Sequence, residues 1–174
     1  MDAHLFITFD AHEFVALGDG LMASPKVVAE EAKRAMERSA ITVQNAAKLN
    51  LQRQGAIDTG QLLNSIAREV QPFEARIGSN KQYARLVEGA DEEGRLHEWS
   101  RRPGMPPPPP GSLLGWMNRH NIPEELETTI RFSIARKGIK ARPYLIPALE
   151  QNRAQIDREF AAAQKRIVKR TMQP

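Results

Sequence analysis

The triplet Asp58-Thr59-Gly60 is the first group of residues whose types could do chemistry, because aspartic proteases use such a triplet. In those enzymes a second carboxylate shares a proton with the first one. The triplet of this chain follows the mainly polar residues 53–56, not a hydrophobic strand. Asp58 also lies three residues before Gln61, which is the spacing of a capping box. We therefore interpret Asp58 as a helix cap and not as a catalytic acid.

Metal, thiol and phosphate chemistry find no support in the sequence either. The chain has no cysteine and four scattered histidines, His4, His12, His97 and His120. No two of the histidines have the i+3 or i+4 spacing of a helical metal pair. The glycine-rich loop of nucleotide-binding proteins is absent, and so is any serine, histidine and acid signature. We expect no enzyme activity, no metal and no cofactor.

Basic residues are concentrated at the end of the chain and could meet phosphates. From residue 131 onward there are eleven Lys and Arg against three Asp and Glu. Residues 143–172 have helical periodicity, with an apolar face made of Leu149, Ile156, Phe160, Ala163 and Ile167. The opposite face carries Arg153, Arg158, Lys165, Lys169 and Arg170. This basic face could contact DNA or an acidic partner, although exposed cations on a helix are often only solvated.

The bulk composition is that of a globular protein. The chain has 174 residues, of which 41% are hydrophobic and 26% are charged. This length favours one domain spanning residues 1–174. No stretch of about 18 apolar residues could span a membrane, and the first residues lack the pattern of a signal peptide.

The first half of the chain alternates strands and helices. We expect a strand at 4–9, a short helical turn from Asp10 to Leu17, and a long helix from Ser24-Pro25 to about Gln54. Many apolar positions of that helix are alanine, which predicts a close-packed neighbour. A short helix follows from Asp58. Strands at 67–70 and 74–77 are joined by a turn and closed by Gly78-Ser79-Asn80, and a short helix at 83–88 ends at Gly89.

Residues 91–140 read as an inserted arm. Residues 91–111 are expected to be irregular and include five prolines from Pro106, which favour an extended polyproline conformation. Short helices follow at 113–120 and 123–138, with Trp116 as a core residue. The terminal helix then occupies 143–172, with Pro147 in its first turn, and it is long enough to leave the body of the protein. The predicted fold class is α+β: a small antiparallel sheet packed against the two long helices.

Three segments in this order resemble the HK97 gp10-like family of neck or tail-completion proteins of long-tailed bacteriophages, including minor tail protein Z-like members. They are residues 58–66, residues 77–80 with 83–84 and 87–89, and residues 141–145 with 147–149. The resemblance covers about residues 25–160, and residues 105–138 resemble an insertion of the longer members. The motif residues are Asp58, Thr59, Gly60, Tyr83, Glu88, Gly89, Arg142, Pro143 and Pro147.

The resemblance implies a structural virion protein at the head–tail joint. It would form an oligomeric ring, with a hexamer favoured over a dodecamer, and leave a channel for genomic DNA. Its neighbours would be the tail terminator and the head-completion or connector proteins, and it would assemble in the host cytoplasm without a membrane. The motif residues would have structural roles: Arg142 would pair with a carboxylate such as Glu88, and Pro143 and Pro147 would fix the angle of the terminal helix.

A nucleic-acid-binding accessory protein is the alternative function. It would act through the basic face of the terminal helix, and its affinity for DNA would fall steeply with salt. The sequence leaves open whether this face lines a DNA channel or docks on an acidic partner.

Overall fold

The computed structural model of the chain describes residues 5–11, 15–16, 25–91 and 93–172. It divides into two compact units, the first made of residues 1–84 and 144–174 and the second of residues 85–143. The fold class is α+β, as predicted. The predicted helical turn at 10–17 falls largely outside the described residues, and so does Ser24, the predicted cap of the first long helix.

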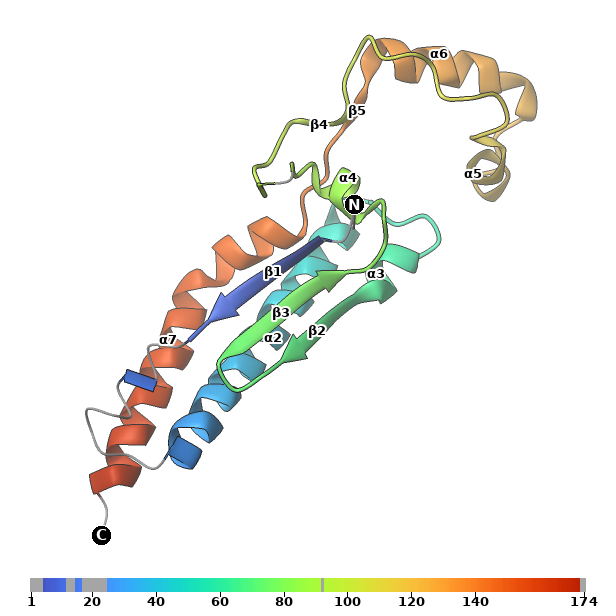
Figure 1. Cartoon of the computed structure of the whole chain (residues 1–174). Helices are drawn as coiled ribbons and strands as arrows, with labels where there is room; N and C mark the ends of the chain where they lie inside the picture. The colour runs from blue at the N-terminus through green and yellow to red at the C-terminus, as the bar shows by residue number, and fades with distance from the viewer. Residues whose placement is uncertain (1–4, 12–14, 17–24, 92, 173–174) are drawn as a thin grey trace. The chain divides into compact units, whose positions relative to one another are not determined.

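The first unit contains a three-stranded antiparallel sheet with the order β1-β3-β2 (Figure 1). Its strands are β1 (Leu5–Asp10), β2 (Ile66–Val70) and β3 (Glu74–Ser79). Leu5 and Ile66 both pair with Ser79, so the central strand is held along its length from both sides. The alternation of buried and exposed residues places Ala75, Ile77 and Ser79 in the core.

The predicted break at Gly78 is wrong, because Gly78 lies inside β3 and pairs with Phe6 of β1 and Ala67 of β2. A Cβ atom at this position would lie 2.7 Å from the Phe6 Cα atom. Glycine is therefore needed here for the close approach of two strands, not for a turn.

Two long antiparallel helices cover one face of this sheet (Figure 1). Helix α2 (Pro25–Arg53) contacts β2, β3 and helix α7 (Leu145–Met172). Four alanines of α2, Ala32, Ala35, Ala40 and Ala47, are completely buried. The absence of bulk on this face lets the neighbouring elements approach closely, which confirms the predicted close-packed neighbour.

The start of α7 is fixed to the end of α2. The Asn50 side chain donates a hydrogen bond to the Tyr144 carbonyl oxygen over 3.1 Å, and both residues are buried. Pro147 is the third residue of α7, where a missing N–H leaves no helical hydrogen bond unmade. The core positions of α7 include Ile156, Ala163 and Ile167, as the periodicity predicted.

The second unit is built from short elements. They are most of α4 (Ala84–Glu88), then β4 (Trp99–Arg101), α5 (Leu114–Arg119), the 3-10 turn η1 (Glu124–Leu126), α6 (Glu127–Lys137) and β5 (Ile139–Lys140). Strands β4 and β5 pair with each other, so residues 91–111 are not irregular throughout. A three-residue strand is too short to give a periodic signal in sequence.

The prediction that Trp116 is a core residue is wrong. Trp116 is 37% exposed and lies against the ring of His120, whereas its neighbour Met117 is completely buried. Among the described residues of this unit, Met117 is the one buried apolar side chain, and α6 contains no buried residue. The second unit therefore has almost no core of its own.

Candidate assembly surfaces

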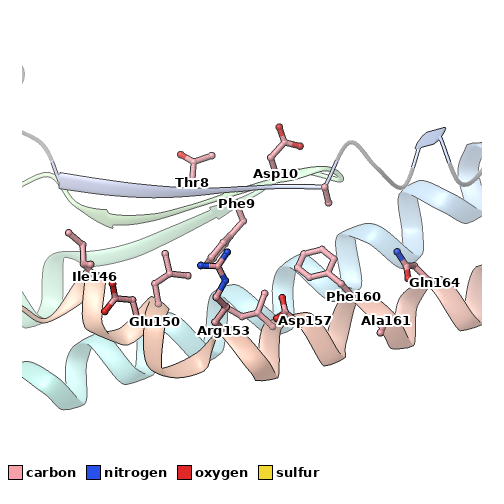
Figure 2. Close-up of a pocket in the computed structure, with 13 residues that line it drawn as sticks. Thr8, Phe9, Asp10, Ile146, Glu150, Arg153, Asp157, Phe160, Ala161 and Gln164 are labelled. Atoms are coloured by element: carbon pink, nitrogen blue, oxygen red, sulfur yellow. The ribbon is translucent and has the colours of Figure 1, made fainter. Parts of the chain in front are cut away.

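A groove of about 690 Å³ runs between β1 and α7 in the first unit (Figure 2). Its apolar lining includes Phe9, Ile146, Leu149, Ile156 and Phe160. Figure 2 shows Phe9 extending from β1 toward α7, and Phe160 rising from α7. Of these side chains only Ile156 is fully buried. Among the described residues, β1 is an edge strand of the sheet, so the groove borders a strand edge that no other described strand pairs with.

Acidic residues predominate at the rim of this groove. Glu150 and Asp157 extend from α7, and Arg153 is the one cation in the lining, whereas the Asp10 side chain of β1 points away from α7 (Figure 2). Glu150, Arg153 and Asp157 are all exposed, and within the described structure none of the three forms an ion pair. The groove is thus apolar at its floor and net negative at its rim.

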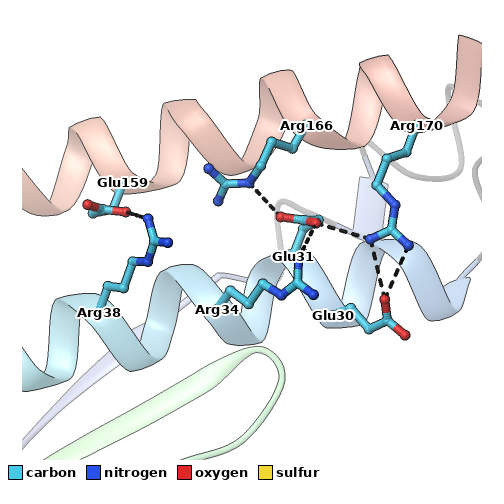
Figure 3. A network of polar contacts seen from close by, with 7 residues as sticks. All are labelled: Glu30, Glu31, Arg34, Arg38, Glu159, Arg166 and Arg170. Atoms are coloured by element: carbon cyan, nitrogen blue, oxygen red, sulfur yellow. Dashed lines mark hydrogen bonds and ion pairs between the residues drawn. The ribbon is translucent and has the colours of Figure 1, made fainter.

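Helices α2 and α7 are joined by an ion-pair cluster around Glu31 (Figure 3). The Glu31 carboxylate accepts hydrogen bonds from Arg166 Nε at 2.6 Å, Arg170 at 3.0 Å and Arg34 at 3.0 Å. Its side chain is only 1% exposed, whereas its arginine partners remain partly exposed. Arg170 also pairs with Glu30, and Arg38 pairs with Glu159 nearer the middle of the helices.

This cluster keeps Glu31 ionised. Burial by itself would raise the pKa of the carboxyl, but the hydrogen bonds from Arg166 and Arg170 and the nearby charges lower it overall. The cluster ties the last turns of α7 to the first turns of α2. The expectation that the terminal helix leaves the body is therefore wrong, because α7 packs along α2.

The five basic residues predicted to form one contact face occupy three different environments. Arg153 lines the groove, and Arg170 pairs with Glu30 and Glu31. Arg158, Lys165 and Lys169 are exposed and spaced by seven and four residues, which places them in one row on the outer side of α7. We call these three residues the basic row.

The first motif begins a helix in a different way from the predicted capping box. Helix α3 (Gln61–Ser65) is preceded by Gly60 in the left-handed conformation, with a φ angle of 74°, so Gly60 and not Asp58 takes the N-cap position. The first helical hydrogen bond joins the Asn64 N–H to the Gly60 carbonyl over 2.9 Å. Asp58 therefore lies outside the cap, because Gly60 redirects the backbone after it.

A serine hydroxyl of the first motif segment contacts a serine hydroxyl of the second segment within the first unit. Ser65 Oγ and Ser79 Oγ lie 2.7 Å apart, and Ser79 Oγ also accepts a hydrogen bond from the Lys81 N–H. Ser79 is completely buried. These contacts attach the short helix α3 to the central strand, which is a structural and not a catalytic role.

The second and third motif segments meet within the second unit. The Arg142 N–H donates a hydrogen bond to the Val87 carbonyl over 2.8 Å. Gly89 has a φ angle of 74°, and a Cβ atom added there would lie 2.4 Å from Ala141 Cβ. Only glycine satisfies both the backbone angle and this contact. Tyr83, which belongs to the second segment but lies in the first unit, is 40% exposed.

Helix α6 presents an exposed patch in the second unit. The patch is lined by Met105, Thr129, Phe132, Ser133 and Arg136, which we call the α6 patch. Phe132 is 59% exposed and Met105 is 44% exposed, so the patch presents two large apolar side chains to solvent. Arg136 follows Phe132 by one helical turn, so an aromatic ring and a cation lie next to each other.

Only some of the residues that form these surfaces could be recognised from the sequence. Glu31 could have been noticed, since it lies on the apolar stripe of its helix, between Val28 and Ala35. Leu149 and Phe160 belong to the predicted apolar face of the terminal helix, but they border the groove and are only partly buried. Phe9 and Phe132 gave no signal, because no local pattern tells which apolar residue remains uncovered.

Two kinds of site are not found in the parts of the chain that the structure describes. No three His, Asp or Glu residues there are arranged to hold a metal ion. No helix there has the length and apolar character needed to cross a membrane.

Comparison with known families gives one result. Residues 16–89 match the family model described as "Bacteriophage HK97-gp10, putative tail-component". This segment of the chain is HK97-gp10-like. The match confirms the resemblance and includes α2, the first motif and the second motif, whereas the third motif and α7 lie outside it.

This family description supports a structural role in a bacteriophage tail and a location in the virion. A tail-component family also favours a protein without catalytic activity. No curated protein and no solved structure shows a significant match to the chain.

Proposed function

We propose that this protein is a neck or tail-completion subunit at the head–tail joint of a long-tailed bacteriophage. Copies form a ring, with six subunits favoured over twelve, around a channel through which the genome passes. The observation that carries this proposal is the match of residues 16–89 to the HK97 gp10 tail-component family. The protein acts by binding neighbours and performs no reaction.

The second unit supports assembly as the mode of action. Its one buried apolar side chain is Met117, among the residues described, so its packing contributes little stability by itself. Exposed apolar side chains that are held on an ordered helix are typical of surfaces that another protein covers. The neighbours in the virion are further copies, the tail terminator and the head-completion or connector proteins, and assembly takes place in the host cytoplasm.

Loss of the protein from the phage that encodes it tests this proposal. A nonsense mutation in its gene should give filled heads and finished tails that do not join, as seen by electron microscopy of the lysate. Supplying the protein from a plasmid should restore joined particles. Joined, infectious particles without the protein would contradict the proposal.

A DNA-binding accessory protein is the second candidate, and the basic row favours it. Arg158, Lys165 and Lys169 are all exposed on one side of α7. Within the described structure, none of the three forms an ion pair with a carboxylate. A row of cations on one helix face could follow the phosphates of one strand.

The salt dependence of binding separates the two functions. An accessory protein binds short duplex DNA as a monomer or dimer, and reversing the three charges of the basic row should reduce the slope of log affinity against log salt by about three. A neck subunit, in contrast, binds free DNA only weakly. Its basic row contacts DNA only when a ring brings the rows of many copies together.

A further inference from the structure

We propose that the groove of one copy receives the α6 patch of the next copy. This inference rests on the proposed function, since it requires that copies assemble. It names the two surfaces that join them: the space between β1 and α7, and the residues around Phe132 on α6.

The apolar parts of the two surfaces complement each other. The groove offers a floor with Phe9, Leu149 and Phe160, open along the edge strand β1. The patch offers Phe132, whose side chain is more than half exposed, with Met105 beside it. Aromatic and arginine side chains that enter pockets contribute most to the affinity of protein interfaces. Phe132 and Arg136 form such a pair.

The charges of the two surfaces are opposite. Carboxylates outnumber cations at the groove, where Glu150 and Asp157 form no ion pair in the described structure. The patch contains Arg136, which is followed by Lys137, and no acidic residue lies in α6 after Glu127. An acidic rim around an apolar floor fits a basic helix end that carries an exposed phenylalanine.

A second copy is the occupant that this arrangement favours. Every copy carries one groove and one patch, so the two surfaces are present in equal number. Because they are different surfaces, their contact is head-to-tail and repeats from copy to copy. Such contacts close into rings when the rotation between copies allows it. The contact also covers the outer edge of β1, which would otherwise be open to pairing with other chains.

Cross-linking between single-cysteine variants tests the contact directly, because the natural chain has no cysteine. Thr129→Cys places a thiol at an exposed position of the patch and leaves Phe132 intact, and Ala161→Cys places one on an exposed position of the groove. The two variants are mixed and treated with a short bis-maleimide, since a disulfide would require Cα atoms within about 7 Å. We expect covalent dimers in the mixture and few with either variant alone.

Leu86→Cys is the matched control for the patch variant. Leu86 is exposed, like Thr129, and also belongs to the second unit. Mixed with Ala161→Cys, it should give few covalent dimers. Equal yields from the Leu86 and Thr129 variants would overturn the proposal.

Charge reversal gives a second test by native mass spectrometry. Arg136→Glu and Asp157→Arg should each weaken self-association by about tenfold, and a mixture of the two variants should recover hetero-association. Lys33→Glu, at an exposed position of α2, is the control and should assemble like the wild type.

The outcomes distinguish this inference from the function on which it rests. If the wild type assembles and both charge reversals assemble equally well, the ring stands and the groove contact is wrong. If the wild type stays monomeric, alone and with its virion neighbours, both are wrong. If the two cysteines cross-link only when placed in the same chain, the patch occupies its own groove and the contact between copies is wrong.

Discussion

Glu31 shows how one buried carboxylate can hold two helices in place. It receives hydrogen bonds from three arginines, two of which belong to α7. The acid is buried, while the arginines reach toward solvent. An isolated carboxylate would be costly at this place, so the cluster stabilises the pair of helices only as long as its cations are present.

Glu31→Gln should lower the free energy of unfolding by about 2 kcal/mol at neutral pH, because hydrogen bonds to charged groups contribute about that much. The pKa of Glu31 is lowered from its ordinary value of 4.5, so ionisation stabilises the folded state. The difference in the free energy of unfolding between wild type and variant is therefore fully present at any pH above the pKa that Glu31 has in the unfolded chain. This difference declines as the pH falls from there through the pKa that Glu31 has in the folded protein.

Urea unfolding at several pH values measures this effect. Glu37→Gln, an exposed carboxylate on the same helix, is the control and should change the stability little. A constant difference between Glu31→Gln and wild type down to acidic pH would show that the charge of Glu31 is not the source of the effect.

Arg142 and Glu88 remain a predicted pair. The backbone of Arg142 lies against α4 through its hydrogen bond to Val87, and the Glu88 side chain is completely buried. A buried carboxylate requires a cation or several donors. A double-mutant cycle with Arg142→Met and Glu88→Gln should give a coupling energy of at least about 1 kcal/mol. If the two substitutions change the free energy of unfolding additively, Arg142 and Glu88 do not form a pair.

At the scale of elements, Gly78 decides whether β1 can join the sheet. A Cβ atom at this position would lie 2.5 Å from a ring carbon of Phe6 and 2.7 Å from its Cα atom. The strand itself would have to move, because backbone atoms cannot turn away as a side chain can. The close approach of β1 and β3 is accompanied by a cation–π contact between them, in which the guanidinium of Arg76 lies 4.1 Å from the centre of the Phe6 ring.

Gly78→Ala should destabilise the protein by at least about 2 kcal/mol, as overpacking at a rigid contact does. Hydrogen exchange should show lost protection in β1 before the rest of the sheet. Gly115→Ala is the matched control. An added Cβ there meets only the end of Arg119 at 3.6 Å, so stability should stay equal or rise by up to about 1 kcal/mol. Equal stability of both variants would contradict the role given to Gly78.

Elements with strong local signals were predictable. The period of α2, the proline at the start of α7 and the turn between β2 and β3 each placed an element within a few residues of its position. Helix caps and short strands were not predictable in the same way. The left-handed Gly60 replaced the cap expected at Asp58, and β4 exists because β5, about 40 residues later, pairs with it.

The candidate surfaces were harder to predict than the fold. A periodic stripe tells that Phe160 and Leu149 face inward, but whether they are covered depends on how far the sheet extends over α7. The basic residues of α7 likewise looked equivalent in sequence. Their separation into groove, cluster and outer row follows from the positions of β1 and α2, which only the fold determines.

At the scale of the whole molecule, the two units differ in how they are stabilised. The first has a continuous core between a sheet and two long helices. The second has short elements, one buried apolar side chain in its described part, and exposed apolar side chains around α6. A chain with one stable unit and one poorly covered unit is suited to assembly, because contacts between copies can supply the missing burial.

The mass distribution of the purified protein tests the central claim most directly. Native mass spectrometry would be recorded for the protein alone and mixed with the tail terminator of the same phage. We predict a closed ring, of six copies, in at least one of the two samples. A protein that stays monomeric in both, yet shifts to a complex on short duplex DNA, would contradict the ring and establish the nucleic-acid function in its place.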